Sequence, residues 1–195
     1  MKLVTIRRKF AEEFQVFRQQ KISCRRLWNV DEATGFYLYQ IVLSSHPGRI
    51  LEIGTSNGYS TFWLSLASEE VDALIDTVEV DAARQASALA NLKGRKNIIF
   101  YLGLAERIIP SLQFSYDLVF LDANKADYIS YLKLLLPLLN NNALIIADNV
   151  ISHRESVHEY LDFIVNNPSF VSETLNIGDG LEITRFQESK EVQYA

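Results

Sequence analysis

Polar residues follow two apolar segments of this chain, at the point where each segment ends. The segment YDLVFLD ends in Asp122, three residues before Lys125, and ALIIADN ends in Asp148 and Asn149. Carboxylate and amide oxygens suit magnesium, manganese or calcium rather than zinc or copper. Two neighbouring carboxylates repel each other unless a cation or a proton lies between them. These residue types favour a divalent-cation site, although Asp122 alone would also fit a helix N-cap and Asp148-Asn149 a polar turn.

A glycine-containing turn and a second acid at a strand end point to a nucleoside ligand. The stretch ILEIGTSNGYS follows an apolar strand and contains Gly54 and Ser56. Ser56 stands where a dinucleotide fingerprint needs its second glycine, which disfavours a nicotinamide cofactor. Glu79 ends the next strand, where a carboxylate can accept hydrogen bonds from both ribose hydroxyls. An adenosine bound without a pyrophosphate suggests S-adenosylmethionine as the ligand. The alternatives are that the glycine turn only allows tight packing of strand against helix, and that Glu79 is a solvated acid at a strand end.

The elements that must position these residues alternate between strands and helices. The pattern predicts strands in 49–54, 72–80, 97–102, 116–122 and 143–148, and helices in 58–67, 82–93, 104–112, 126–139 and 155–167. Repeated βα units with short apolar strands predict an α/β fold, with a parallel sheet covered on both faces. Ligands bind outside the carboxyl ends of such strands, so the acids and the glycine turn converge on one edge.

The segments outside these units are predicted to be helical at the start and a hairpin at the end. Apolar residues share one face of a helix over 3–20, namely Ile6, Phe10, Phe14 and Phe17. This face predicts cover for the core, with an oligomer contact or a lid as the other interpretation. A second helix is predicted over 31–45, and Gly178-Asp179-Gly180 predicts a turn between two antiparallel strands.

The composition is that of an ordinary globular protein with a mildly acidic balance. The 195 residues, of which 48% are hydrophobic and 22% charged, suffice for one domain with a substantial core. A net charge of −5 argues against a nucleic-acid binder held by a general basic field. The single cysteine, Cys24, fits a reducing compartment. No apolar run has the length of a membrane span or signal peptide, so the sequence predicts a cytoplasmic protein without a membrane partner.

Five motifs in order resemble the cation-dependent O-methyltransferases, the family of catechol and caffeoyl-CoA O-methyltransferases and many bacterial relatives. They are LEIGTSNGYS, VEVD, FLDANKADY, ADNV and IGDGLEITR, and the resemblance runs from Asn29 to Phe186. It implies the Rossmann-like fold of S-adenosylmethionine-dependent methyltransferases, with a seven-stranded, mostly parallel sheet, an antiparallel last strand and helices on both faces. We predict a single methyltransferase domain over 1–195, made of a helical extension (1–28), which matches no motif of the family, a core (29–186) and a tail (187–195).

The resemblance assigns roles to individual residues. It implies that the cofactor S-adenosylmethionine is bound by Val30, Glu52, Gly54, Ser56, Ser60, Glu79, Gly103, Ala105 and Asp122. Within this set, Glu52, Gly54, Ser56 and Ser60 would line its methionine end, Glu79 would hold the ribose, and Gly103 and Ala105 would lie near the adenine. A divalent cation (Mg²⁺, or Mn²⁺ or Ca²⁺) would be held by Asp122, Asp148 and Asn149. Lys125 would be the catalytic base.

The sequence departs from the family pattern at places that bear on both ligands. Leu104 stands where many relatives have a polar residue near the adenine, and Ala123 and Asn124 stand where some catechol enzymes carry aromatic residues. The segment 150–156 lacks the tryptophan often found after Asp-Asn. Trp28 is predicted either to line the substrate mouth or to be a buried structural residue.

Together these features predict an enzyme that methylates a hydroxyl of a small catechol-like or other vicinal-hydroxyl compound. One alternative is a tRNA hydroxyuridine O-methyltransferase, which a pI of about 5.3 disfavours. Another is a non-catalytic S-adenosylmethionine-binding module, against which the intact Asp122, Lys125, Asp148 and Asn149 argue. A nicotinamide oxidoreductase is a further alternative, weakened by Ser56. The phenylalanine-rich N-terminal face and the dimers common in the family predict a homodimer.

Overall fold

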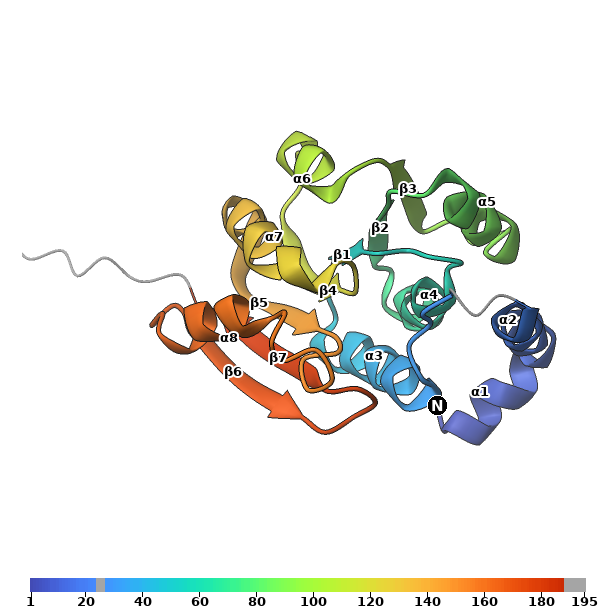
Figure 1. Ribbon diagram of the computed structural model, residues 1–195. Helices are drawn as coiled ribbons and strands as arrows, with labels where there is room; N and C mark the ends of the chain where they lie inside the picture. Colours follow the sequence, from blue (N-terminus) through green and yellow to red (C-terminus); the bar gives the residue numbers. More distant parts are fainter. Residues whose placement is uncertain (24–26, 188–195) are drawn as a thin grey trace, which may run out of the picture.

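A seven-stranded sheet with helices on both faces forms the body of the protein. The computed structural model describes residues 1–23 and 27–187, so Cys24 and most of the predicted tail lie outside the described part. The strand order is β3-β2-β1-β4-β5-β7-β6 (Figure 1). The strands are β1 (Arg49–Ile53), β2 (Leu74–Glu79), β3 (Ile98–Leu102), β4 (Tyr116–Leu121), β5 (Leu139–Ala147), β6 (Phe170–Leu175) and β7 (Leu181–Phe186). The first five pair in parallel, and β7 lies antiparallel between β5 and β6, which confirms the predicted fold class.

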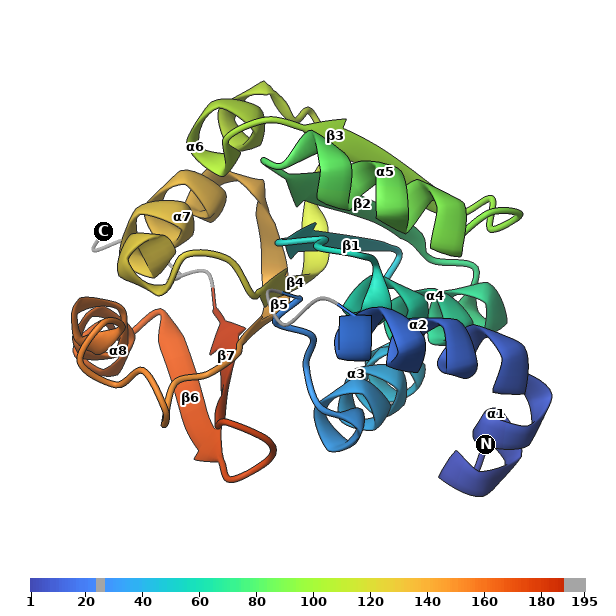
Figure 2. The ribbon, with the colours of Figure 1, turned by 45° about the vertical axis from the view of Figure 1, so that its right-hand side comes forward.

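Alternate residues of the central strands face two separate hydrophobic layers. Ile50, Phe120 and Ile146 face the layer built with α3 (Glu32–Ser45), α4 (Tyr59–Val71) and α5 (Ala82–Asn91). Their neighbours along the strands face the layer built with α6 (Ala105–Ile108), α7 (Tyr128–Leu135) and α8 (His158–Val165). Figures 1 and 2 show α6, α7 and α8 grouped on one side of the sheet and α3 and α4 on the other. Burial on both faces explains why these strands read as unbroken apolar runs.

The parallel strands bring their carboxyl ends to one level. Ile53 of β1 pairs with Val78 on one side and with Leu121 on the other, and Leu121 in turn pairs with Ala147. The residues that follow these partners along the chain therefore emerge together at one edge. This arrangement confirms the convergence predicted from the sequence.

The N-terminal segment forms two helices rather than the single one predicted over 3–20. They are α1 (Leu3–Lys9) and α2 (Ala11–Ser23). At Phe10 the backbone leaves helical geometry, with φ −119° and ψ 37°. The rings of Phe10, Phe14 and Phe17 lie 5.9, 5.3 and 5.4 Å from that of Phe62 on α4 (Figure 2 shows α2 beside α4). The aromatic face therefore covers the chain's own core, and the homodimer remains a prediction without support from this face.

Several predicted elements have different ends in the structure. The helix predicted over 104–112 is α6 followed by a 3-10 turn, η1 (Ile109–Ser111), which contains Pro110 as expected from its restricted backbone. Two further 3-10 turns, η2 (Lys125–Asp127) and η3 (Leu136–Leu138), flank α7. β5 begins at Leu139, four residues before the predicted strand, because backbone pairing to Tyr116 continues beyond the apolar run. Within the described ranges, no helix is both long and apolar enough to cross a membrane.

A buried ion pair joins the starts of three strands away from the carboxyl edge. Arg49 Nε and Nη2 lie 2.7 and 3.0 Å from the carboxylate oxygens of Asp76, whose side chain is fully buried. The Tyr116 hydroxyl donates to the same carboxylate at 2.7 Å. The Phe114 ring lies 3.6 Å from the Arg49 guanidinium carbon. The Asp76 carboxylate on β2 accepts hydrogen bonds from Arg49 on β1 and Tyr116 on β4, and it thereby connects the three strands.

Candidate active site

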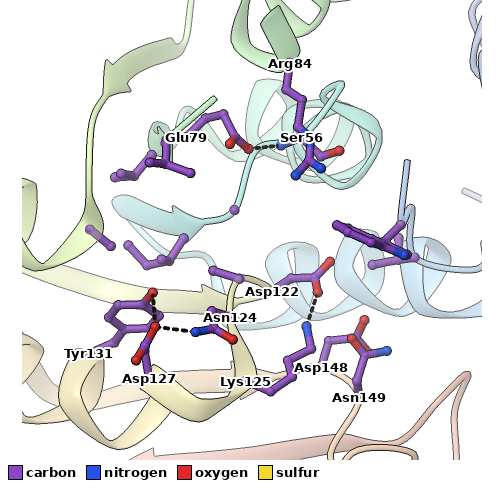
Figure 3. A pocket seen from close by; sticks show the side chains of 18 of the residues that line it. Ser56, Glu79, Arg84, Asp122, Asn124, Lys125, Asp127, Tyr131, Asp148 and Asn149 are labelled. Atoms are coloured by element: carbon purple, nitrogen blue, oxygen red, sulfur yellow. Dashed lines mark hydrogen bonds and ion pairs between the residues drawn. The ribbon is translucent and has the colours of Figure 1, made fainter. Parts of the chain in front are cut away.

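A cavity of about 890 Å³ lies along the carboxyl ends of the parallel strands (Figure 3). Its lining includes ten of the predicted site residues, namely Val30, Gly54, Ser56, Glu79, Gly103, Ala105, Asp122, Lys125, Asp148 and Asn149. Two others, Glu52 and Ser60, do not line it. The structure therefore brings most of the candidate residues, from segments far apart in the sequence, around one space.

The turn after β1 needs glycine at Gly54. Its φ is +109°, and a Cβ atom there would lie 2.2 Å from the backbone oxygen of Asp122. This close approach sets the turn against the end of β4, so only glycine fits. Ser56, with φ +50°, directs its backbone N–H to Glu79 Oε2 at 2.7 Å. The turn thereby connects the ends of β1, β2 and β4.

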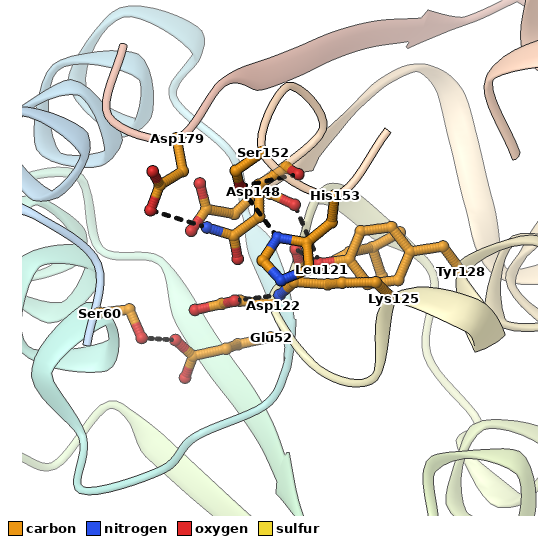
Figure 4. A network of polar contacts seen from close by, with 11 residues as sticks. Glu52, Ser60, Leu121, Asp122, Lys125, Tyr128, Asp148, Ser152, His153 and Asp179 are labelled. Carbon is orange, nitrogen blue, oxygen red and sulfur yellow. Dashed lines mark hydrogen bonds and ion pairs between the residues drawn. The ribbon is translucent and has the colours of Figure 1, made fainter. Parts of the chain in front are cut away.

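Glu52 and Ser60 are buried and do not belong to the cavity lining, so their contact with the methionine end of S-adenosylmethionine stays a prediction. Glu52 is fully buried and accepts hydrogen bonds from Ser60, Thr61 and Thr77 (Figure 4 shows the bond from Ser60). Burial raises the pKa of its carboxyl to about 7, although these hydrogen bonds oppose the shift. Alternation along β1 turns Glu52 to the same side as Ile50, towards α4. Glu52 therefore ties β1 to α4, through Ser60 and Thr61, and to Thr77 of β2.

Glu79 is held in the cavity wall by two backbone donors. Its oxygens accept hydrogen bonds from the N–H groups of Ser56 (2.7 Å) and Asp81 (2.8 Å), and its side chain is almost fully buried. A carboxylate has about four acceptor positions, so two remain for a ligand. The geometry suits the two hydroxyls of a ribose.

The second polar group gathers at the ends of β4 and β5 (Figure 4). Lys125 Nζ lies 2.7 Å from Asp122 Oδ1. The hydroxyl of buried Tyr128 lies 2.8 Å from the carbonyl oxygen of Leu121 and 3.2 Å from that of Asp148, so it bridges the two strand ends. Asn149 adopts a left-handed backbone, with φ +63°. We call the set Asp122, Lys125, Asp148 and Asn149 the acidic corner.

The electrostatics of the acidic corner fit a bound divalent cation. Asp148 is 3% exposed, and its Oδ1 has no hydrogen-bond partner among the described residues. Burial, and then the charge of Asp122, raises the pKa of Asp148 to about 7. Burial also raises the pKa of Asp122, and Lys125 opposes that shift. An unpartnered carboxylate oxygen beside a second buried carboxylate is a place where a cation is stabilised.

The third predicted ligand of this corner, Asn149, offers an amide oxygen. Over residues 1–23 and 27–187, no group of three or more His, Cys, Asp or Glu side chains is arranged to hold a metal. The set fits magnesium only when Asn149 is counted with the two aspartates. Oxygen ligands of this kind are those that magnesium accepts alongside water.

Two residues near the acidic corner were not predicted as site residues. Asp179 lies in the β6–β7 turn, and Asn149 Nδ2 lies 3.4 Å from its Oδ2. His153 lines the cavity, and its Nδ1 lies 2.9 Å from Ser152 Oγ. Asp179 belongs to a motif that the sequence marks only as a hairpin turn, and the antiparallel pairing of β5 with β7 is what brings it here. His153 lies in an irregular segment that gives no periodic signal.

The mouth of the cavity carries Trp28. Its side chain is 71% exposed and lines the cavity, which confirms the prediction of a mouth residue and excludes the buried alternative. The Arg84 guanidinium carbon lies 5.1 Å from its ring. Lys21 of α2 also lines the cavity, so the N-terminal helices contribute to the site.

Comparisons with known proteins agree with this geometry. Residues 51–150 match the family model described as a methyltransferase domain. Catechol O-methyltransferase B of Danio rerio is 32% identical over 183 residues, which cover 86% of this chain and 67% of that protein. Caffeoyl-CoA O-methyltransferase of Medicago sativa is 24% identical over 207 residues, which cover 90% and 83%.

A solved structure supports the fold independently. The Podospora anserina methyltransferase PaMTH1, determined bound to SAH, superposes with a TM-score of 0.83 at 22% identity, covering 92% of this chain and 88% of that one. At this identity the likeness shows the shared fold. It places the present sheet order among those of methyltransferase structures.

Proposed function

The chain belongs to the methyltransferase domain family, with catechol and caffeoyl-CoA O-methyltransferases among its relatives, and on this premise we propose that it methylates a hydroxyl of a small catechol-like or other vicinal-hydroxyl compound with the aid of a divalent cation. Like those relatives it is an S-adenosylmethionine-dependent O-methyltransferase. The observation that carries the proposal is the buried Asp148 Oδ1 beside Asp122: this oxygen has no hydrogen-bond partner in residues 1–23 and 27–187 and lies in the same cavity as Glu79.

The upper part of the cavity in Figure 3 is proposed to hold S-adenosylmethionine. Glu79 accepts the ribose hydroxyls with the acceptor positions that Ser56 and Asp81 leave open. The backbone of Gly54 and Ser56 approaches the methionine end, with Val30 and Asp122 beside it. The adenine lies against Gly103 and Ala105. The volume of the cavity is in the range of sites for small-molecule ligands and leaves room for an acceptor.

The acidic corner is proposed to position and deprotonate the acceptor. Asp122, Asp148 and Asn149 would hold the cation, and oxygen ligands of this kind suit a cation that also accepts hydroxyl oxygens. A divalent cation there supplies Lewis acidity, which lowers the pKa of a hydroxyl bound to it. Lys125, whose Nζ faces the corner at 2.7 Å from Asp122, would act in its neutral amine form: it would take the proton of the acceptor hydroxyl and become an ammonium, while the oxygen takes the methyl group. The wall around these residues keeps the reacting oxygen close to the methyl donor.

The direct test is transfer of a labelled methyl group from S-adenosylmethionine to a panel of acceptors. The panel pairs each catechol with the phenol that lacks its second hydroxyl, and it includes bulk tRNA. We expect label in the catechols and much less in the matched phenols, because two oxygens are needed to chelate the cation. Label in tRNA alone would replace the small-molecule acceptor with the nucleic-acid alternative. Label in no acceptor would contradict both proposals.

Removing divalent cations is expected to stop turnover. The oxygen-only ligand set requires a hard cation to position the acceptor, so excess chelator should reduce methyl transfer to background and added magnesium or manganese should restore it. Chelator already saturated with magnesium is the matched control. Affinity for S-adenosylhomocysteine should change by no more than a few fold. Full activity in excess free chelator would exclude the metal role.

Glu79→Ala is expected to weaken cofactor binding. Hydrogen bonds to a charged group contribute roughly 1.5–3 kcal/mol, which corresponds to about a tenfold to hundredfold rise in Kd for S-adenosylmethionine. Titration calorimetry measures this change. Glu12→Ala, at an exposed position on α2, is the matched control and should bind normally. Because Glu79 also accepts from two backbone N–H groups, each variant must first show a cooperative melt. Unchanged affinity in folded Glu79→Ala would refute the ribose assignment.

A further inference from the structure

At the end of the cavity next to β3, the loop that follows this strand offers few polar side chains. The loop after β3 contributes Gly103, Leu104 and Ala105 to the lining, and Leu104 is 48% exposed. Gly103, Leu104 and Ala105 present backbone and apolar side chains to a ligand. A planar base can lie against these three residues, but they provide no side-chain hydrogen bond that distinguishes one purine from another. The Glu106 carboxylate also lines this end of the cavity.

The facing wall of this end carries a polar cluster at the start of α7. Asn124, Asp127 and Tyr131 all line the cavity, and Figure 3 shows Asp127 and Tyr131 away from Asp148 and Asn149. Asn124 Nδ2 donates to Asp127 Oδ2 at 2.6 Å, and the Tyr131 hydroxyl lies 3.5 Å from the same oxygen. Both contacts orient the Asp127 carboxylate within the cavity.

The side chain of Asp127 does not cap α7. It stands at the N-cap position of α7, where aspartate commonly accepts a hydrogen bond from the first turn, yet its side chain makes no such bond. Within the described part of the chain, its contacts are made through Oδ2, and no hydrogen bond reaches Oδ1. The partly buried carboxylate therefore retains an acceptor in the cavity wall.

An acceptor at this place discriminates between purines. Adenine carries a 6-amino group, which donates, whereas hypoxanthine carries a 6-oxo group, which only accepts. A carboxylate that faces position 6, and not the N1–H that hypoxanthine also carries, pairs with the first and repels the lone pairs of the second. The opposite wall has no side-chain donor at Leu104 or Ala105 that would reverse this preference.

We propose that the Asp127 carboxylate, oriented by Asn124 and Tyr131, accepts a hydrogen bond from the 6-amino group of the cofactor's adenine and so selects adenine over 6-oxo purines. This assignment rests on the proposed function, because that function places the ribose at Glu79 and the base against Gly103 and Ala105. It makes Asp127 a residue that determines specificity for the methyl donor. Leu104, in the loop after β3, has an apolar side chain and cannot take this role.

The test compares the binding of two ligands that differ at one position of the base. The Kd values of S-adenosylhomocysteine and S-inosylhomocysteine are measured by calorimetry for the wild-type protein and for Asp127→Asn. The wild type should prefer the adenine ligand by about tenfold to a hundredfold, the usual effect of a hydrogen bond to a charged group. Asp127→Asn should lose most of this preference or reverse it, because its amide can donate to the 6-oxo oxygen.

Two further variants separate this inference from the proposed function. Glu106→Gln removes a carboxylate from the same end of the cavity and should leave the ratio of the two Kd values unchanged. Glu79→Ala should weaken both ligands equally and also leave the ratio unchanged. A wild-type ratio near one, or a full preference in folded Asp127→Asn, would overturn the role of Asp127 while leaving the proposed function intact. If the wild-type protein bound neither ligand, both would fail.

Discussion

Asp148→Ala is expected to abolish methyl transfer while leaving the affinity for S-adenosylmethionine within a few fold. The side chain belongs to the acidic corner, and its Oδ1 has no partner in the described part of the chain. Without it the acceptor hydroxyl is neither positioned nor acidified, so turnover should fall to background. Cofactor affinity should persist because the proposed ribose contacts lie at Glu79, on β2.

The metal role of Asp148 has a readout that does not depend on activity. Magnesium that binds only the folded state raises the melting temperature of the wild-type protein. It should have no such effect on Asp148→Ala, which should itself melt higher without metal because the repulsion from Asp122 is relieved. Asp162→Ala, at an exposed position on α8, is the matched control and should behave as wild type. If Asp148→Ala lost cofactor binding in a folded protein, its assignment to the metal would be wrong.

Asp76→Ala is expected to lower the free energy of unfolding by about 3–5 kcal/mol, as observed when one partner of a buried ion pair is removed. The substitution leaves the Arg49 guanidinium, whose side chain is 13% exposed, without its acceptor. It also removes the acceptor of the Tyr116 hydroxyl. Urea denaturation followed by circular dichroism measures the change.

The neighbouring Tyr116→Phe substitution calibrates this result. It removes one hydrogen bond to a charged group and keeps the ion pair, so it should cost about 1.5–3 kcal/mol. Both variants, where folded, should keep normal cofactor affinity because the pair lies away from the cavity lining. A loss of less than about 1 kcal/mol in Asp76→Ala would show that the ion pair contributes no more than a single neutral hydrogen bond.

The positions of the acidic corner and of Glu79 were predictable because they depend on rules that act along the chain. Apolar runs of strand length mark where a strand ends, and parallel strands in one sheet bring those ends together. Asp122 and Asp148 therefore meet although 26 positions separate their numbers in the sequence. The same reasoning could not place Glu52, because it requires knowing which face of β1 each alternate residue takes.

The remaining site residues depend on tertiary contacts that leave no periodic pattern. Asp179 reaches Asn149 only because β7 pairs with β5, a long-range choice of partner. Asp127 would pass for a helix cap in the sequence, and only the direction of its side chain places it in the cavity. The break at Phe10 likewise follows from the packing of aromatic rings on α4, which helical spacing alone does not reveal.

The place of β7 in the sheet sets the order in which a newly made chain can become active. β7 lies between β5 and β6, and the carbonyl oxygens of Asp179 and Gly180 accept hydrogen bonds from the backbone N–H groups of residues 150–152, just after Asn149. As the chain leaves the ribosome, the edge of β5 stays unpaired until residues 181–186 have emerged. The part of the cavity around Gly54 and Glu79, built from earlier strands, can form before β7 has emerged, whereas the acidic corner gains its final support only after β7 has paired with β5.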